Sequence, residues 1–175
     1  MISVLKIPVE VYEELTEHLL SPDSNREEAA FLFVSVDRSH EKICFEVVET
    51  WKLRSADFDY HYEDYLELAD EVRAQIIKRA HDIGTSLVEI HSHPFSLPAA
   101  FSFADRIGLK ETVPHMWWRL NKRPYLAIVV APSGFDALLW LDNPETPQRL
   151  DCVVVGENIL NPTNNSLGGW NDGSS

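Results

Sequence analysis

The sequence has few cysteines and few basic residues, and it lacks any long hydrophobic run. Its two cysteines, Cys44 and Cys152, lie in separate apolar stretches without the spacing of a metal site. We therefore expect buried free thiols and no disulfide. No stretch is long and apolar enough to span a bilayer, and the start, MISVLKIPVEVYEEL, lacks the charged-then-apolar order of a signal peptide. We expect a cytoplasmic protein without a membrane partner.

The shortage of basic residues bears on the choice of partner. The chain has 15 Lys and Arg residues against 28 Asp and Glu residues, which gives a formal net charge of −13 at pH 7. An acidic surface repels phosphates, which argues against nucleic acid. The sequence also has no basic stripe, no glycine-rich phosphate loop and no internal repeat. This composition favours a neutral or basic partner.

The apolar patterns predict one α/β domain, in which helices flank a mixed sheet. The domain is expected to cover residues 1–160, and residues 161–175, rich in Asn, Gly and Ser, are expected to form a flexible C-terminal tail that catalysis does not need. Residues 58–65 read as an aromatic and acidic loop. The expected helices are 8–20, 63–81 and 102–112, and the expected strands are 29–36, 43–51, 86–91, 125–131, 135–141 and 153–155.

The stretch EIHSHPFSLPAAFSFAD, which begins at Glu89, carries the main chemical signal. Side chains alternate faces along a strand, so His91 and His93 point the same way. Two such imidazoles can bind one zinc ion, and a catalytic zinc site needs a third protein ligand. Asp105 can supply it from the first turn of the next helix. Ser102, three residues earlier, lies on the same helical face.

Other interpretations of these residues remain open. Ser102 and Asp105 also form a good helix-start signal, because serine caps helices and a carboxylate is favourable in the first turn. Glu89 shares the face of the two histidines and is a rival ligand, although a supporting or solvent-facing role suits it better. A TIM-barrel hydrolase needs about 250 residues. The surroundings of His93 lack the Asp-His of a metallo-β-lactamase and the nearby Glu of a cupin.

The pattern Glu…His-Ser-His-Pro…Ser-x-x-Asp resembles the JAMM motif of the JAB/MPN metalloprotease family. The matching elements extend from the first helix to the hairpin at 137–140. The resemblance implies a cytidine-deaminase-like JAB/MPN fold and one zinc ion per chain. It also implies that His91, His93 and Asp105 bind the metal, that Ser102 stabilises the oxyanion and that an upstream glutamate activates water. Active members of the family cleave after the C-terminal glycine of ubiquitin or a ubiquitin-like protein.

The upstream glutamate should stand in REEAAFLF, at the head of a strand. The family pattern is similar to Glu-x-x-small-x-Leu, which Glu27 satisfies with Ala30 and Leu32, whereas Glu28 does not. Without the histidine pair, Glu27 would be read as a solvated turn residue. The loop between His93 and Ser102 has eight residues, where the family usually shows seven. We expect a bulge to absorb the extra residue. The longer loop indicates a divergent, bacterial-type member of the family.

The resemblance implies a zinc-dependent isopeptidase or peptidase that deconjugates a ubiquitin-like protein or matures its precursor. It also suggests E1-like and E2-like partners in a bacterial pathway, either antiviral defence or sulfur-carrier processing. Residues 51–65 and 115–119 are expected to contact the substrate, although Trp117 and Trp118 are equally suited to cover the core. The alternatives are a non-catalytic MPN-type binding module and a small-molecule metal-dependent amide hydrolase.

Overall fold

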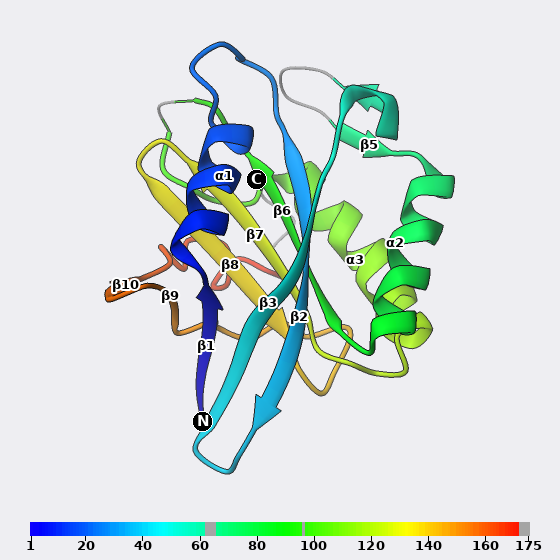
Figure 1. Cartoon of the computed structure of the whole chain (residues 1–175), viewed down its shortest axis with the longest axis vertical. Coiled ribbons are helices and arrows are strands. Elements are labelled where there is room, and N and C mark those ends of the chain that lie inside the picture. Colours follow the sequence, from blue (N-terminus) through cyan, green and yellow to red (C-terminus); the bar gives the residue numbers. More distant parts are fainter. Residues whose placement is uncertain (62–65, 96, 172–175) are drawn as a thin grey trace.

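The computed structural model describes residues 1–61, 66–95 and 97–171. It has an α/β architecture, with a curled, mixed eight-stranded sheet in the order β10-β9-β1-β3-β2-β6-β7-β8 and a separate ribbon of β4 and β5 (Figure 1). The described elements are β1 (Ile2–Ile7), α1 (Val9–Leu19), β2 (Ala29–Arg38), β3 (Lys42–Lys52), the 3-10 turn Ser55–Asp57, β4 (Phe58–His61), β5 (Leu66–Leu68), α2 (Asp70–Ile83), β6 (Ser86–Ser92), α3 (Phe103–Arg119), β7 (Tyr125–Ala131), β8 (Gly134–Trp140), β9 (Cys152–Val155) and β10 (Asn158–Leu160).

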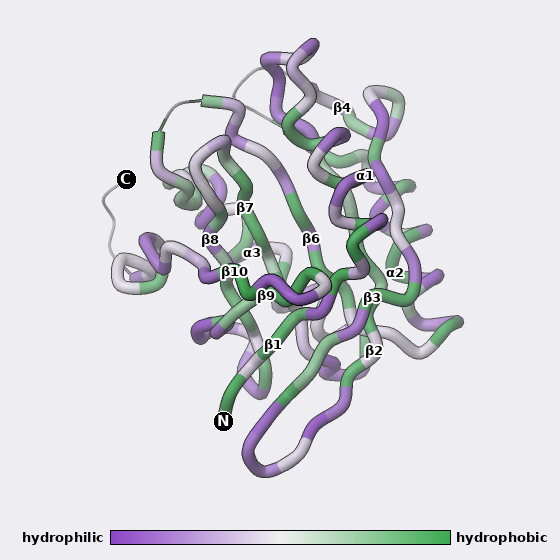
Figure 2. The backbone as a smooth tube through the Cα atoms, turned by 60° about the vertical axis from the view of Figure 1, so that its left-hand side comes forward, coloured by the Kyte–Doolittle hydropathy of each residue, from purple (hydrophilic) through white to green (hydrophobic). Residues whose placement is uncertain are grey.

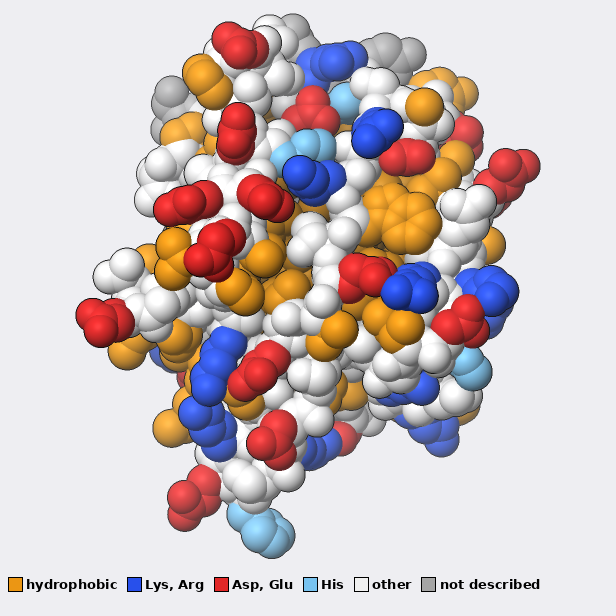
Figure 3. All heavy atoms as spheres, in the orientation of Figure 1, with side chains coloured by type: hydrophobic (Ala, Val, Ile, Leu, Met, Phe, Trp, Pro, Cys, Tyr) orange, Lys and Arg blue, Asp and Glu red, His pale blue; other side chains and the backbone are white. Residues whose placement is uncertain are grey.

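The two faces of the sheet form two hydrophobic cores. Alternate residues of β2, such as Leu32 and Val34, pack with α1 on one face, whereas Phe31 and Phe33 pack with α2 and α3 on the other. α1 covers one face, and α2 and α3 cover the other (Figure 1). Acidic side chains gather over α1 on the face shown in Figure 3. The turn between β2 and β3 is hydrophilic (Figure 2), as expected for a solvated hairpin.

Three expected elements differ from the structure. The helix expected at 63–81 begins only at Asp70, because Leu66 and Leu68 belong to β5, which pairs with β4. Strand β4 itself lies inside the loop expected at 58–65. The helix expected at 102–112 continues to Arg119 through Pro114. The burial of Val113, Met116 and Trp117 offsets the loss of the backbone hydrogen bond that the proline removes. Strands β1 and β10 were not expected. Gly84 ends α2 in the left-handed conformation.

The expected flexible tail is wrong for the part of it that the structure describes. Residues 161–171 run back over the domain, and the indole of Trp170 is buried 5.6 Å from the ring centroid of Trp140. Ser166 is buried as well, with hydrogen bonds to the rest of the chain. Composition misled the prediction because two anchoring side chains are enough to fix a segment of Asn, Gly and Ser. Residues 172–175 lie outside the described part.

Both cysteines are free thiols, as predicted, with Cys44 buried and Cys152 partly buried. In the described ranges, no helix is both long and apolar enough to cross a membrane.

Candidate metal centre

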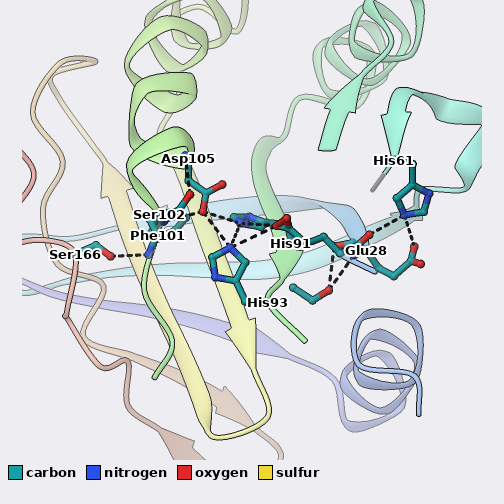
Figure 4. Close-up of polar contacts among 10 residues, drawn as sticks. Glu28, His61, His91, His93, Phe101, Ser102, Asp105 and Ser166 are labelled. Atoms are coloured by element: carbon teal, nitrogen blue, oxygen red, sulfur yellow. Dashed lines mark hydrogen bonds and ion pairs between the residues drawn. The ribbon is translucent and has the colours of Figure 1, made fainter. Parts of the chain in front are cut away.

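Four side chains from three parts of the chain converge at one end of the sheet. His91 lies near the end of β6, His93 follows that strand, and Asp105 lies in the first turn of α3. His91 Nε2 is 3.2 Å from His93 Nε2, and Asp105 Oδ2 is 3.2 Å from the first nitrogen and 3.1 Å from the second (Figure 4). Glu27, just before β2, completes a group whose potential ligand atoms all lie within 4.8 Å of one another.

These distances fit a tetrahedral metal ion. Ligand atoms about 2.0–2.1 Å from such an ion lie about 3.3–3.4 Å from one another. The three edges among His91, His93 and Asp105 are only slightly shorter than this. Two imidazole nitrogens and one carboxylate oxygen are also a usual donor set for zinc. The three predicted ligands are therefore brought together in an arrangement that could hold a metal ion.

Strand register decides which of the two adjacent glutamates reaches this group. In the antiparallel pairing of β2 with β6, Ala29 lies opposite His91. Continuing this register by two residues brings Glu27 opposite His93, and Glu27 Oε1 is 3.4 Å from His93 Nε2 and 3.9 Å from His91 Nε2. Glu28 points elsewhere, with its carboxylate 3.6 Å from His61 Nε2 (Figure 4). The predicted choice of Glu27 agrees with this geometry.

The serine between the two histidines fixes the backbone that carries Glu27. Ser92 is buried on the opposite face of β6, and its hydroxyl accepts a hydrogen bond of 2.9 Å from the Glu28 amide. The Ser92 amide donates in turn to the Glu28 carbonyl. His61 of β4 contacts the Glu27 carbonyl through Nε2 at 2.7 Å. No sequence pattern indicated this contact of His61, because it depends on how the β4–β5 ribbon folds back.

Ser102 caps α3 and lies beside the candidate metal ligands without belonging to their group. Its hydroxyl accepts from the Asp105 amide at 3.0 Å, and its own amide donates to Asp105 Oδ2 at 2.9 Å. The capping interpretation is therefore confirmed. A hydroxyl that accepts through one lone pair keeps its proton available for donation, so the cap leaves Ser102 able to donate to a ligand. The same cap also orients the Asp105 carboxylate toward the histidines.

The electrostatics couple His91 to the acidic groups around it. Burial lowers the pKa of His91, but Asp105, Glu27 and Glu89 outweigh this effect and raise its pKa to about 9. Burial has the opposite effect on a carboxyl group and raises the pKa of Asp105, but His91 and His93 together hold this pKa well below its usual range. This part of the protein therefore favours a cationic centre between carboxylates, which a metal ion would provide after displacing the proton.

Glu89 shares a strand face with His91 but does not belong to the group of potential ligands. Its Oε1 accepts a hydrogen bond of 2.7 Å from the Tyr125 hydroxyl. Burial raises the pKa of Glu89 despite this bond and the nearby Arg73, and burial with the Glu89 charge raises the pKa of Tyr125. The supporting role expected for Glu89 fits this position better than direct ligation.

A pocket of about 800 Å³ opens beside the candidate ligands Glu27, His91 and Asp105. Apolar side chains form much of its wall: Phe31, Leu53, Phe58, Leu66, Phe103 and Ile107. Among the described residues, its lining also carries the carboxyl groups of Glu67, Asp70 and Glu111, in addition to those of Glu27, Glu89 and Asp105, and the guanidinium of Arg73. A chain segment with apolar and basic side chains would complement this surface.

The two regions expected to contact a substrate have different outcomes. Phe58 from the first region lines the pocket, whereas residues 62–65 of that region lie outside the described part. In the second region Trp117 is buried in the core, and Trp118 is exposed, with 61% of its surface accessible. Trp117 therefore covers the core, whereas Trp118 is exposed on the surface.

No protein-family model matches the sequence, and a search among curated proteins finds no match either. The functional argument therefore rests on the residues and on their geometry.

Proposed function

We propose that the protein is a zinc-dependent isopeptidase or peptidase of the JAMM type, with a JAB/MPN fold. The observation that carries this proposal is the convergence of His91, His93 and Asp105 with Glu27 beside them and Ser102 at the adjoining helix start. Each of these side chains matches one position of the motif. The α/β sheet with helices on both faces is compatible with the proposed fold.

His91, His93 and Asp105 would hold the zinc ion, and Ser92 and Ser102 keep the surrounding backbone in place. Bound zinc supplies Lewis acidity, which polarises a scissile carbonyl and lowers the pKa of water toward ~7. Glu27, buried and within 3.4 Å of His93 Nε2, is placed to accept the proton of the attacking water. It then returns that proton to the leaving amine as general acid.

Ser102 would donate its hydroxyl proton in a hydrogen bond to the oxygen that becomes negative in the transition state. Such a donor contributes about 2.7–4 kcal/mol in other enzymes. Because the reaction adds water directly, no covalent intermediate with the enzyme forms. Neither Cys44 nor Cys152 lies among the candidate ligands, so thiol chemistry has no place in this scheme.

The substrate in this proposal is the extended C-terminal tail of a ubiquitin-like protein, cleaved after its last glycine. Glycines let the backbone approach a recessed ion closely. The pocket beside the ligands, with apolar walls and the carboxyl groups of Glu67, Asp70 and Glu111, supports a tail that carries apolar and basic side chains before the glycines. E1-like and E2-like proteins of a bacterial conjugation pathway in the cytoplasm, such as one in antiviral defence, complete the proposal as partners.

The test incubates the purified protein, loaded with zinc, with a conjugate of a ubiquitin-like protein, with and without a chelator. Genes that lie beside its own identify the ubiquitin-like protein to use. Cleavage after the terminal glycine that stops with the chelator and returns with added zinc supports the proposal. Turnover of small amides without cleavage of conjugates indicates a small-molecule hydrolase instead. A protein that binds no zinc and cleaves neither substrate indicates a non-catalytic binding module.

A further inference from the structure

Residues 163–170, here called the C-terminal strap, lie against the loop that joins His93 to Ser102. The Ser166 hydroxyl accepts a buried hydrogen bond of 2.7 Å from the Phe101 amide (Figure 4). Two residues earlier in the loop, the Ala99 carbonyl accepts from the Thr163 hydroxyl at 2.9 Å and from Nδ2 of the Asn165 side chain at 3.1 Å. The end of the loop thus depends on the strap for its backbone hydrogen bonds.

The strap itself is anchored on the sheet. The Ser166 amide donates to Oδ2 of Asp136 at 2.9 Å, and Oδ1 of this fully buried carboxyl accepts from the Ala137 amide. The Thr163 amide donates to the carbonyl of Phe135 on β8. Buried hydrogen-bonded chains of this kind hold their members rigidly, because each broken bond leaves a buried polar group without a partner.

A second set of contacts holds α3 on the far side of Asp105. The Arg106 guanidinium donates to the Gly169 carbonyl, and Lys110 Nζ lies 5.2 Å from the ring centroid of Trp170. Trp170 is buried against Trp140. The strap therefore holds the chain both before Ser102 and after Asp105, although none of its residues belongs to the group of potential ligands.

Phe101 connects the strap to a ligand directly. Its ring centroid lies 5.9 Å from that of His91, so a shift of the loop would disturb an imidazole as well as the helix start. This loop is also the one that is one residue longer than the pattern it resembles. A longer loop has more conformations to lose on folding, and the strap provides the contacts that select one of them.

We propose that the C-terminal strap is a positioning element of the metal site, in which Ser166, bonded to Asp136, fixes the loop and helix start that carry Ser102 and Asp105. The proposal rests on the metal-binding part of the proposed function and not on the nature of the substrate. Ser166 touches no ligand atom among the described residues, so it acts through Phe101.

The test measures zinc affinity by competition with a chelating dye, and the geometry of the site by the absorption spectrum of the cobalt-substituted protein. Ser166→Ala removes the acceptor of the Phe101 amide, so we expect zinc to bind about 10-fold more weakly or worse, with an altered cobalt spectrum. Ser166→Thr retains a hydroxyl and should recover most of this affinity. Asn161→Ala changes an exposed residue just before the strap and should match the wild type in both measurements.

Leu15→Ala is the matched control for stability, because it opens a cavity in the core around α1, on the opposite face of the sheet. It should lower the unfolding midpoint while the zinc affinity of the folded protein stays normal. Wild-type zinc affinity and cobalt spectrum in Ser166→Ala would overturn this inference alone. Equal losses of affinity in Ser166→Ala and Leu15→Ala would overturn it too, by reducing the effect to stability. Failure of the wild type to bind zinc would overturn the proposed function as well.

Discussion

At the scale of single residues, the backbone geometry decides why Glu27 and Glu28 have different surroundings. Adjacent residues in an extended backbone point to opposite sides. Glu27 therefore faces the two imidazoles, whereas Glu28 faces His61. The roles of two chemically identical side chains follow from their position alone.

Glu27→Gln should lower kcat by roughly 10²–10⁴-fold, because the amide cannot accept the proton of the attacking water. Zinc content should stay near one equivalent per chain, since His91, His93 and Asp105 remain. Steady-state kinetics on a ubiquitin-like conjugate, together with elemental analysis, measure both quantities. Glu28→Gln is the matched control and should stay near the wild-type rate. The reverse result, with Glu28→Gln inactive, would contradict the assignment of the base.

The raised pKa of His91 predicts that zinc binding to the metal-free protein releases a proton. With a pKa of about 9, His91 is protonated at pH 7, and a zinc ligand must be neutral. Zinc affinity should therefore fall as the pH falls below 9. Calorimetric titrations in buffers with different ionisation enthalpies count the released protons. A binding enthalpy that does not depend on the buffer at pH 7 would contradict this prediction.

The same shift has a consequence for the stability of the metal-free protein. The folded-state pKa of His91 lies above the ordinary value of 6.5, so its protonation stabilises the fold fully below about pH 6.5. This contribution is lost as the pH rises through about 9. Denaturant unfolding of the metal-free protein between pH 6 and pH 10 should show the decline. His91→Gln should remove the part of the decline that belongs to this histidine.

At the scale of elements, the segment after β10 belongs to the fold. Truncation after Leu160 was expected to leave catalysis intact, but the burial of Trp170 and Ser166 reverses that expectation. Trp170→Ala should lower the free energy of unfolding by about 3–5 kcal/mol, as large-to-small changes at buried aromatic residues do. Denaturant unfolding measures the change. Trp118→Ala is a suitable control, because this exposed indole should contribute little. Equal stability of Trp170→Ala and wild type would restore the tail interpretation.

At the scale of the whole molecule, the cysteines and the candidate metal ligands lie on different elements of the fold. Cys44 lies on β3 and Cys152 on β9, while the ligands come from β6 and from the start of α3. Cys44→Ser and Cys152→Ser should therefore retain cleavage, whereas His93→Ala or a chelator should abolish it. Activity assays of the three variants, each with a thermal melt, measure this. Loss of activity on alkylation of the thiols in a folded protein would point to cysteine chemistry.

Much of the architecture was predictable because strongly periodic segments reveal their own structure. The strands containing Ala30, Val88 and Leu126 are rich in apolar residues, and they lie side by side in the interior of the sheet. The errors occur where tertiary contacts outweigh a local pattern. Leu66 could begin a helix by its spacing, but pairing with His61 makes it part of a strand. The helix expected to end at residue 112 continues through Pro114, because the burial of the neighbouring residues keeps the helix intact.

The sequence by itself determined the local part of the site. The two-residue spacing of His91 and His93 places both imidazoles on one side of a strand, and the Ser-x-x-Asp spacing creates a helix cap that turns Asp105 toward them. These relations hold over a few bonds, so they follow from backbone geometry alone.

Only the tertiary structure decided what joins these residues. The register of β2 on β6 brings Glu27 beside His93. These two residues are about as far apart in the sequence as Glu28 and Ser92, which lie 64 positions apart. The Tyr125 hydroxyl engages Glu89, and Ser166 holds the loop before the helix. Contacts between distant segments depend on which strands pair and on which surfaces are buried together, and no periodicity within a single segment contains that information.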